Sequence, residues 1–293
     1  MSLILPLCAF LCGLLIAQIM DLATITLKKV LSSVLAKFFI PVVIVYNLVF
    51  YQAGSLSLII FSFFVSIILF YLYKLLTQKP LEALCFSYVN MAWLGFPFAI
   101  ALFGPSVSAP IVAIYIGGSI FGNIWAVTAL SSEQESIWKL LNKVLKSPPI
   151  IAIIIALSCR MIGLQNYPNH VWIDLLYSCA KVGMSFSGMC ILGIWLRRTK
   201  VYLDDFINSL YMAIYKIGCG IVICTLTYFW LPIPNIEHYI GVMFLLFCLP
   251  PAANIVALET YYHGTGDSAK MIASGTIVSC VIVLLYGVIL HLF

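Results

Sequence analysis

Charged residues are scarce in this sequence. Only 9% of its 293 residues are Asp, Glu, Lys or Arg, whereas soluble globular domains carry about 25%. A water-soluble fold of this length could not cover its surface with so few charges. The hydrophobic share of 63% and the mean hydropathy of +1.12 instead suit a lipid bilayer as the solvent. No long polar stretch could form a separate soluble domain, so we expect one membrane domain.

Motifs for metal binding and redox chemistry are also lacking. The ten cysteines all fall in apolar segments, and there is neither a CxxC pair nor a Cys/His cluster. We therefore interpret the cysteines as packing residues and expect no metal, no cofactor, no catalytic residue and no enzymatic activity. The net charge of +5 comes from basic residues spread over short loops, which does not indicate nucleic-acid binding.

Ten apolar runs approach the roughly 20 residues that a membrane helix needs. The first has no preceding basic residue and no clear cleavage site, so we expect a membrane helix there rather than a signal peptide. The longest polar connection, 131–147, is expected to be a cytoplasmic loop between five spans in 1–130 and five in 148–293. The predicted spans are 2–20, 34–51, 56–76, 83–102, 108–130, 148–165, 171–196, 205–230, 238–262 and 269–291.

The basic residues predict the orientation of these spans. Because cytoplasmic loops carry an excess of Lys and Arg, the odd-numbered connections are expected in the cytoplasm and both termini outside. An odd number of spans in each half makes the halves enter the membrane with opposite polarity, so we predict an all-α inverted repeat. The odd connections hold 12 of the 15 basic residues: Lys28, Lys29, Lys37, Lys74, Lys79, Lys139, Lys143, Lys146, Arg197, Arg198, Lys200 and Lys270.

The fourth and ninth spans are predicted to be broken near their middles. Proline removes a backbone donor and clashes with the preceding turn, and the freed backbone groups cannot face lipid. Two such breaks would form a polar site near the midplane, with helix dipole ends suited to an anion. The alternative is a pair of kinks that only shapes packing. The residues are Asn90, Gly95 and Pro97 in the fourth span, and Pro250, Pro251 and Asn254 in the ninth.

Several polar side chains within spans are candidates for the site. Asn90 and Asn254 can bind a carboxylate, because an amide both donates and accepts, or they can satisfy the freed backbone of their own breaks. Lys216, close to mid-depth, can balance a substrate carboxylate, tether a broken helix or snorkel. Lys181 is a weaker candidate of the same kind. Asn47, near the outer end of its span, is a candidate for lining the path.

Glu259 is the acidic residue inside the ninth span and a candidate proton carrier. Glu259 lies near the cytoplasmic end of the span, where a carboxylate is more often exposed at the interface than used as a proton carrier. The sequence therefore gives little support to coupling with H⁺ or Na⁺. Facilitated transport is the alternative. Asp267 is expected to cap the tenth helix.

At the two breaks the sequence resembles the auxin efflux carrier family, within the bile acid/arsenite/riboflavin transporter-like superfamily. The resemblance covers essentially the whole chain. It implies ten spans in two inverted halves, crossing fourth and ninth helices, elevator-type transport of organic anions and a homodimer. The short midpoint loop is like that of bacterial members, which implies the inner membrane. The matching residues are Asn90, Gly95 and Pro97, then Pro250, Pro251, Asn254, Ala257, Glu259 and Tyr261, the tenth-span stretch 264–279, Lys37, Pro41 and Asn47 in the second span, and Lys216 in the eighth.

The sequence thus favours a secondary transporter, an efflux carrier for small carboxylates that are auxin-like or dicarboxylic. A non-transporting sensor or an assembly subunit is the alternative, and a channel is a third possibility. The expected partners are the anion, H⁺ or Na⁺ if transport is coupled, membrane lipid and a second copy of the chain.

Overall fold

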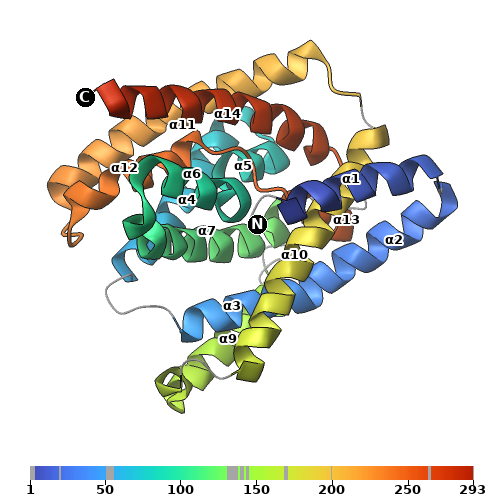
Figure 1. Cartoon of the computed structure of the whole chain (residues 1–293), viewed down its shortest axis with the longest axis horizontal. Coiled ribbons are helices and arrows are strands. Elements are labelled where there is room, and N and C mark those ends of the chain that lie inside the picture. Colours follow the sequence, from blue (N-terminus) through green and yellow to red (C-terminus); the bar gives the residue numbers. More distant parts are fainter. Residues whose placement is uncertain are drawn as a thin grey trace. The chain divides into compact units, whose positions relative to one another are not determined.

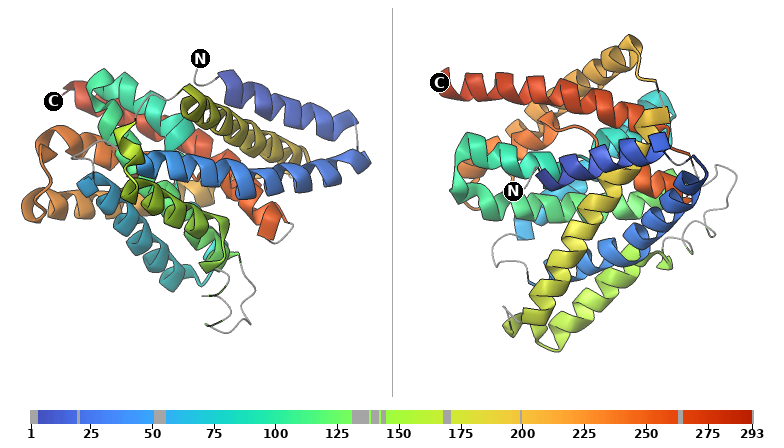
Figure 2. Two further views of the ribbon diagram at one scale, coloured as in Figure 1. Left: turned by 90° about the horizontal axis from the view of Figure 1, so that it is seen from below. Right: turned by 45° about the vertical axis from the view of Figure 1, so that its right-hand side comes forward.

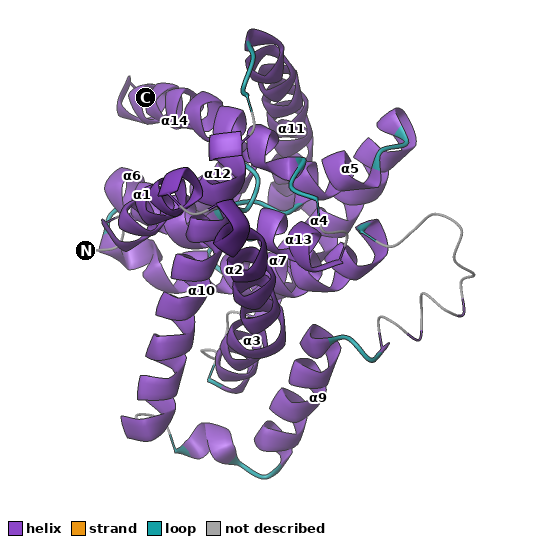
Figure 3. Cartoon of the chain, turned by 90° about the vertical axis from the view of Figure 1, so that its right-hand side faces the viewer, coloured by secondary structure: helices purple, strands orange, loops and turns teal. Residues whose placement is uncertain are grey.

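The computed structural model describes residues 4–19, 21–50, 56–130, 138, 142, 145–167, 171–198, 200–262 and 265–292. These residues are almost all helical, and no strand occurs among them (Figure 3). The following six helical stretches are long and apolar enough to cross a membrane, as expected of a multi-pass membrane protein: Thr24–Val49, Leu56–Thr77, Ala109–Ala129, Val171–Arg197, Leu203–Trp230 and Ser268–Leu290.

The chain folds into two compact units, and each unit takes segments from both halves of the sequence. The first unit comprises Met1–Tyr51, Gly122–Thr199 and Ala253–Ala269, and the second comprises Gln52–Phe121, Lys200–Ala252 and Lys270–Phe293. The division into sequence repeats at 1–130 and 148–293 is a separate prediction, and most of the 131–147 connection lies outside the described residues.

The first unit is a bundle of helices in which α1 packs along α10 and α3 packs along α9 (Figures 1 and 2). Its elements are α1 (Ile4–Ile19), α2 (Asp21–Val34), the π-helical η1 (Leu35–Phe39), α3 (Ile40–Val49), α9 (Pro148–Met161), η4 (Leu164–Asn166), α10 (Val171–Arg198) and α13 (Ile255–Tyr262).

Glycines bring α1 and α10 into backbone contact. A Cβ atom added at Gly13 would lie 2.1 Å from the carbonyl oxygen of Cys190, and one at Gly193 would lie 2.3 Å from that of Phe10. Small residues of this kind allow membrane helices to approach closely. The α1–α10 contact therefore depends on the absence of side chains at these two positions.

The second helical stretch begins earlier than predicted. The expected span was 34–51, whereas α2, η1 and α3 follow one another from Asp21 to Val49, so Lys28 and Lys29 lie in a helix rather than in a connection. The reason is tertiary: Lys28 is 7% exposed, and its ammonium lies 3.3 Å from the ring centroid of Trp195 on α10. This cation–π contact allows a lysine inside the helical bundle.

The second unit contains the fourth predicted span, the first part of the ninth and the helices packed around them. Helix α4 packs on α5, and α11 packs on α12. Its elements are α4 (Leu56–Thr77), α5 (Pro80–Ser87), the π-helical η2 (Met91–Gly95), α6 (Phe96–Phe103), η3 (Pro105–Val107), most of α7 (Ser108–Ala129), α11 (Leu203–Trp230), α12 (Ile236–Cys248) and α14 (Ser268–Leu292).

Candidate functional site at the paired helix breaks

The two predicted interruptions are present, and they pair with each other within the second unit. Residues 88–90 follow α5, and residues 249–252 follow α12. The N–H of Asn90 donates to the carbonyl of Pro250 at 2.8 Å, and the N–H of Ala252 donates to the carbonyl of Tyr88 at 2.9 Å. Val89 and Pro251 form an antiparallel bridge between these two bonds. The pairing satisfies backbone groups that the broken helices leave free.

The two prolines suit this pairing because it needs no N–H group from either. Pro250 contributes only its carbonyl oxygen, and Pro251 faces Val89 at a position that requires no backbone donor. A Cβ atom at Gly275 of α14 would lie 3.0 Å from Cδ of Pro251. The glycine therefore lets α14 approach the break closely.

Gly95 and Pro97 lie just beyond the first break rather than in it. The break ends at Asn90, and the chain continues from Met91 as η2 and α6. Pro97 is the second residue of α6, directly after the π-helical turn. A Cβ atom at Gly95 would lie 2.7 Å from Cδ1 of Leu249, so Gly95 gives room to the residue before Pro250. The fourth span is thus interrupted at residues 88–90, and Pro97 follows the π-helical turn after this break.

Lys216 lies at the same place in the second unit. Its side chain comes from α11 and is 3% exposed, and Nζ donates to the carbonyl of Leu249 at 2.8 Å. Nζ also lies 5.8 Å from the ring centroid of Phe86, which belongs to the last turn of α5. One cation therefore contacts the helix ends that precede both breaks. Among the described residues, no carboxylate forms an ion pair with it.

Asn90 is the last residue of the first break and Asn254 follows the second, and each is 7% exposed. The carbonyl of Asn90 accepts from the N–H of Gly95 at 3.0 Å in the π-helical turn. The carbonyl of Asn254 accepts from the N–H groups of Ala257 and Leu258 at 3.1 and 3.0 Å, which starts α13. Asn90 belongs to the second unit and Asn254 to the first.

Glu259 is buried, which corrects the expectation of an exposed interfacial carboxylate. It is 1% exposed, and its carboxylate accepts four hydrogen bonds from the turn that leads into α14. The donors are the Thr265 hydroxyl at 2.7 Å, the Asp267 N–H at 2.8 Å, the Ser268 N–H at 3.0 Å and the Ser268 hydroxyl. Glu259 thus caps the start of α14, the role that the sequence suggested for Asp267.

A second polar cluster beside Glu259 was not predicted. The indole N–H of Trp195 donates to the Thr260 hydroxyl at 2.8 Å, and that hydroxyl donates to the Val256 carbonyl. A Cβ atom at Gly266 would lie 2.1 Å from the Trp195 ring. Together with Lys28 above the ring, these contacts fix α13 and the following turn inside the first unit.

Lys181 and Asn47 also belong to the first unit. Lys181 is exposed on α10, and its ammonium lies 5.9 Å from the ring centroid of Tyr177. Tyr177 stacks on Tyr46 of α3, whose hydroxyl donates to Asp174 at 2.7 Å. Asn47 follows Tyr46 and is 8% exposed. The roles of Lys181 and Asn47 in binding stay predictions.

No group of three or more His, Cys, Asp or Glu side chains suited to a metal ion occurs among the described residues. The candidate groups are the paired backbone, Lys216 and Asn90 in the second unit, and Asn254 in the first.

The sequence was compared with protein-family models and with curated proteins, and it matches none of them.

Proposed function

We propose that the protein is a secondary transporter that exports small organic anions, as its resemblance to the auxin efflux carriers implies. The observation that carries the proposal is the pairing of two interrupted helices through Asn90–Pro250 and Ala252–Tyr88 hydrogen bonds. Irregular backbone is tolerated at membrane depth only where protein covers it or where it lines a cavity. Transporters bind their substrates at such discontinuous helices.

Lys216 supports an anion as the transported species. It lies 13 residues into α11, about 20 Å along a helix of about 42 Å, and therefore near the middle of the span. A charged side chain at this depth costs at least about 2.5–3.5 kcal/mol. The Leu249 carbonyl engages one of the three N–H donors of the ammonium. A substrate carboxylate would supply the missing negative charge, and Asn90 would add an amide donor.

The order of the helices supports ten spans in two inverted halves. Helices α1, α2–α3, α4, α5–α6 and α7 would correspond in order to α9, α10, α11, α12–α13 and α14. The fourth member of each set is the interrupted one. We propose alternating access of the elevator type, a homodimer, and residence in a bacterial inner membrane with both termini outside.

The contacts of Glu259 support a structural role rather than ion coupling. The four hydrogen bonds to its carboxylate all come from residues 265–268, which form the turn into α14, so this side chain holds the turn in place. A proton carrier must exchange its proton with the pathway during each cycle. We therefore propose that transport does not use Glu259 as a proton carrier.

The test is flux of labelled carboxylates and indole acids in proteoliposomes. Asn90→Ala and Asn254→Ala should each reduce the flux about threefold to tenfold, the effect of losing one hydrogen bond to substrate. Asn208→Ala is the matched control, because Asn208 is exposed in the second turn of α11. If a substrate is transported and both site variants carry it at the rate of the control, the proposed site is wrong.

A thermal-shift screen separates the proposal from a non-transporting membrane protein. Ligands that bind the native state raise its unfolding temperature by mass action. We expect at least one dicarboxylate or indole acid to stabilise the wild type and to stabilise Asn90→Ala less. Failure of every such compound to shift the unfolding temperature would favour the non-transporting alternative.

A further inference from the structure

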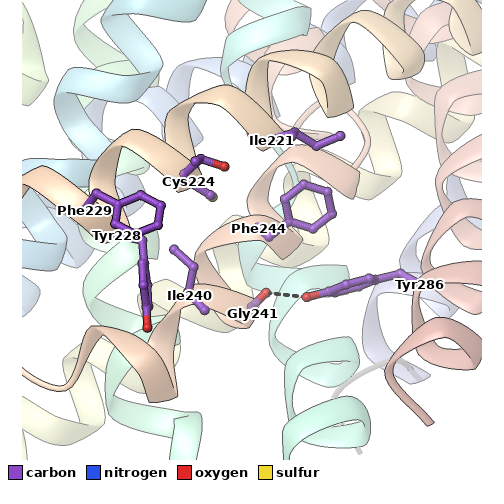
Figure 4. Close-up of a pocket in the computed structure, with 9 residues that line it drawn as sticks. Ile221, Cys224, Tyr228, Phe229, Ile240, Gly241, Phe244 and Tyr286 are labelled. Carbon is purple, nitrogen blue, oxygen red and sulfur yellow. Dashed lines mark hydrogen bonds between the residues drawn. The ribbon is translucent and has the colours of Figure 1, made fainter. Parts of the chain in front are cut away.

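A groove on the second unit is lined by the C-terminal half of α11, by α12 and by Tyr286 of α14 (Figure 4). Its volume of about 350 Å³ falls within the range of small-ligand sites, about 300–1,000 Å³. None of its lining side chains is charged. The lining comprises Ile221, Cys224, Thr225, Tyr228, Phe229, Ile240, Gly241, Phe244 and Tyr286.

The groove forms because the contacts of α14 change along its length. Near its N-terminal end, α14 is held on α11 by the Lys270–Asp205 ion pair at 3.8 Å and by the Ser274–Ser209 hydrogen bond at 2.7 Å. Three turns further on, the Tyr286 hydroxyl donates to the Gly241 carbonyl of α12 at 3.1 Å. At this level α14 is held by α12, and space remains between α14 and α11.

The medium outside the groove is expected to be lipid. Both α11 and α14 are apolar and long enough to cross a membrane. The rim residues Ile221 and Phe229 are 56% and 73% exposed, and Trp230 at the end of α11 is 82% exposed. Exposed aromatic residues at the end of a span belong at the membrane interface. The groove therefore starts at interface level and continues into the hydrocarbon region.

The size and chemistry of the groove select its occupant. The lined stretch of α11, from Ile221 to Phe229, is about 12 Å long, so a flexible apolar chain can lie along the groove. The absence of charge excludes an ionic ligand, and the Tyr286 hydroxyl is already engaged by Gly241. We propose that the groove binds one acyl chain of a membrane phospholipid, entering from the Trp230 end. This proposal does not depend on transport.

The test is photolabelling in vesicles of phosphatidylcholine and phosphatidylglycerol that contain a trace of phosphatidylcholine with a diazirine in one acyl chain. Labelled residues are mapped by mass spectrometry. We expect labels to concentrate on residues 221–229 and 240–244. Thr225→Phe and Ile221→Phe, two exposed positions on the groove, should each reduce this label about tenfold, the effect of losing burial of about two methylene groups.

Leu226→Phe is the matched control, because Leu226 is 48% exposed on the same helix and does not line the groove. It should leave the labelling unchanged. Uniform labelling of all exposed faces of α11 and α14 would overturn the proposal, since it would mean ordinary surface lipid. Crosslinking between two copies through Thr225→Cys would also overturn it, because the occupant would then be protein.

Discussion

The ammonium of Lys216 donates a hydrogen bond to the carbonyl of Leu249, the residue that precedes the Pro250–Pro251 pair. In an uninterrupted helix this carbonyl would accept from the N–H four residues later. The break removes that donor, and a buried cation takes its place. The same ammonium lies above the ring of Phe86 at the end of α5. A single side chain of α11 thus joins the ends of both helices that stop at the paired breaks.

Replacing Lys216 by methionine should separate its structural role from its functional one. The methionine removes a buried charge, which stabilises, and leaves the Leu249 carbonyl without its donor, which costs about 1–3 kcal/mol. We expect the unfolding temperature in detergent to change little and anion binding to be lost. Lys216→Arg should retain part of the binding. If Lys216→Met binds the anion as the wild type does, Lys216 is only a tether.

Much of the helical layout could be predicted from the sequence, because apolar runs bounded by polar residues are a local signal. The breaks could also be located, since Pro250 and Pro251 cannot continue a helix. Their pairing could not be predicted. The pairing brings together residues that are 160 positions apart in the sequence, such as Asn90 and Pro250. A local sequence pattern does not predict such a long-range contact.

Burial of charged residues was harder to predict. Glu259 was expected to be exposed because it lies near a span end, yet the turn at 265–268 folds back over it. Lys28 was assigned to a connection, yet the Trp195 ring holds it inside the bundle. The partner of Lys28 comes from a distant part of the sequence, whereas the donors to Glu259 are close in sequence and reach it only because the chain turns back after α13.

Removal of the charge of Glu259 should destabilise the protein. In Glu259→Gln, an amide NH₂ faces donors that previously bound an oxygen, so we expect a loss of about 2–4 kcal/mol in the free energy of unfolding. Asp267→Asn is the control, because Asp267 is exposed in the same turn. Denaturant unfolding of the two variants is the measurement. Equal stability of Glu259→Gln and Asp267→Asn would contradict the role of the four hydrogen bonds to Glu259.

The glycine contact between α1 and α10 gives a prediction with an internal control. Gly13→Ala places a methyl group against the Cys190 carbonyl, which is backbone and cannot turn away. We expect destabilisation of about 1–3 kcal/mol. Gly218→Ala, on α11, has no neighbouring atom within 4 Å, and should stabilise by up to about 1 kcal/mol through helix propensity. The measurement is thermal unfolding of both variants. If Gly13→Ala and Gly218→Ala destabilised the protein equally, the close contact between α1 and α10 would be refuted.

The orientation predicted from the basic residues can be measured with single cysteines in a background without native cysteine. Gln78 lies between α4 and α5 beside Lys79, and Asn235 lies between α11 and α12. We expect Asn235→Cys to react with an impermeant maleimide in intact cells, and Gln78→Cys to react only after permeabilisation. The reverse pattern would invert the proposed topology.

The most direct test of the transport site is counterflow in proteoliposomes that contain an unlabelled carboxylate identified by thermal shift. Labelled carboxylate outside should accumulate transiently, because a carrier exchanges substrate whereas a channel or a non-transporting protein does not. The account predicts this accumulation for the wild type and for Lys79→Met, an exposed loop lysine paired with Glu82 at 2.8 Å. It predicts a loss of about 10–100-fold for Lys216→Met, the effect of removing one charge-assisted hydrogen bond. Equal accumulation by Lys216→Met and Lys79→Met would contradict an anion site at the paired breaks.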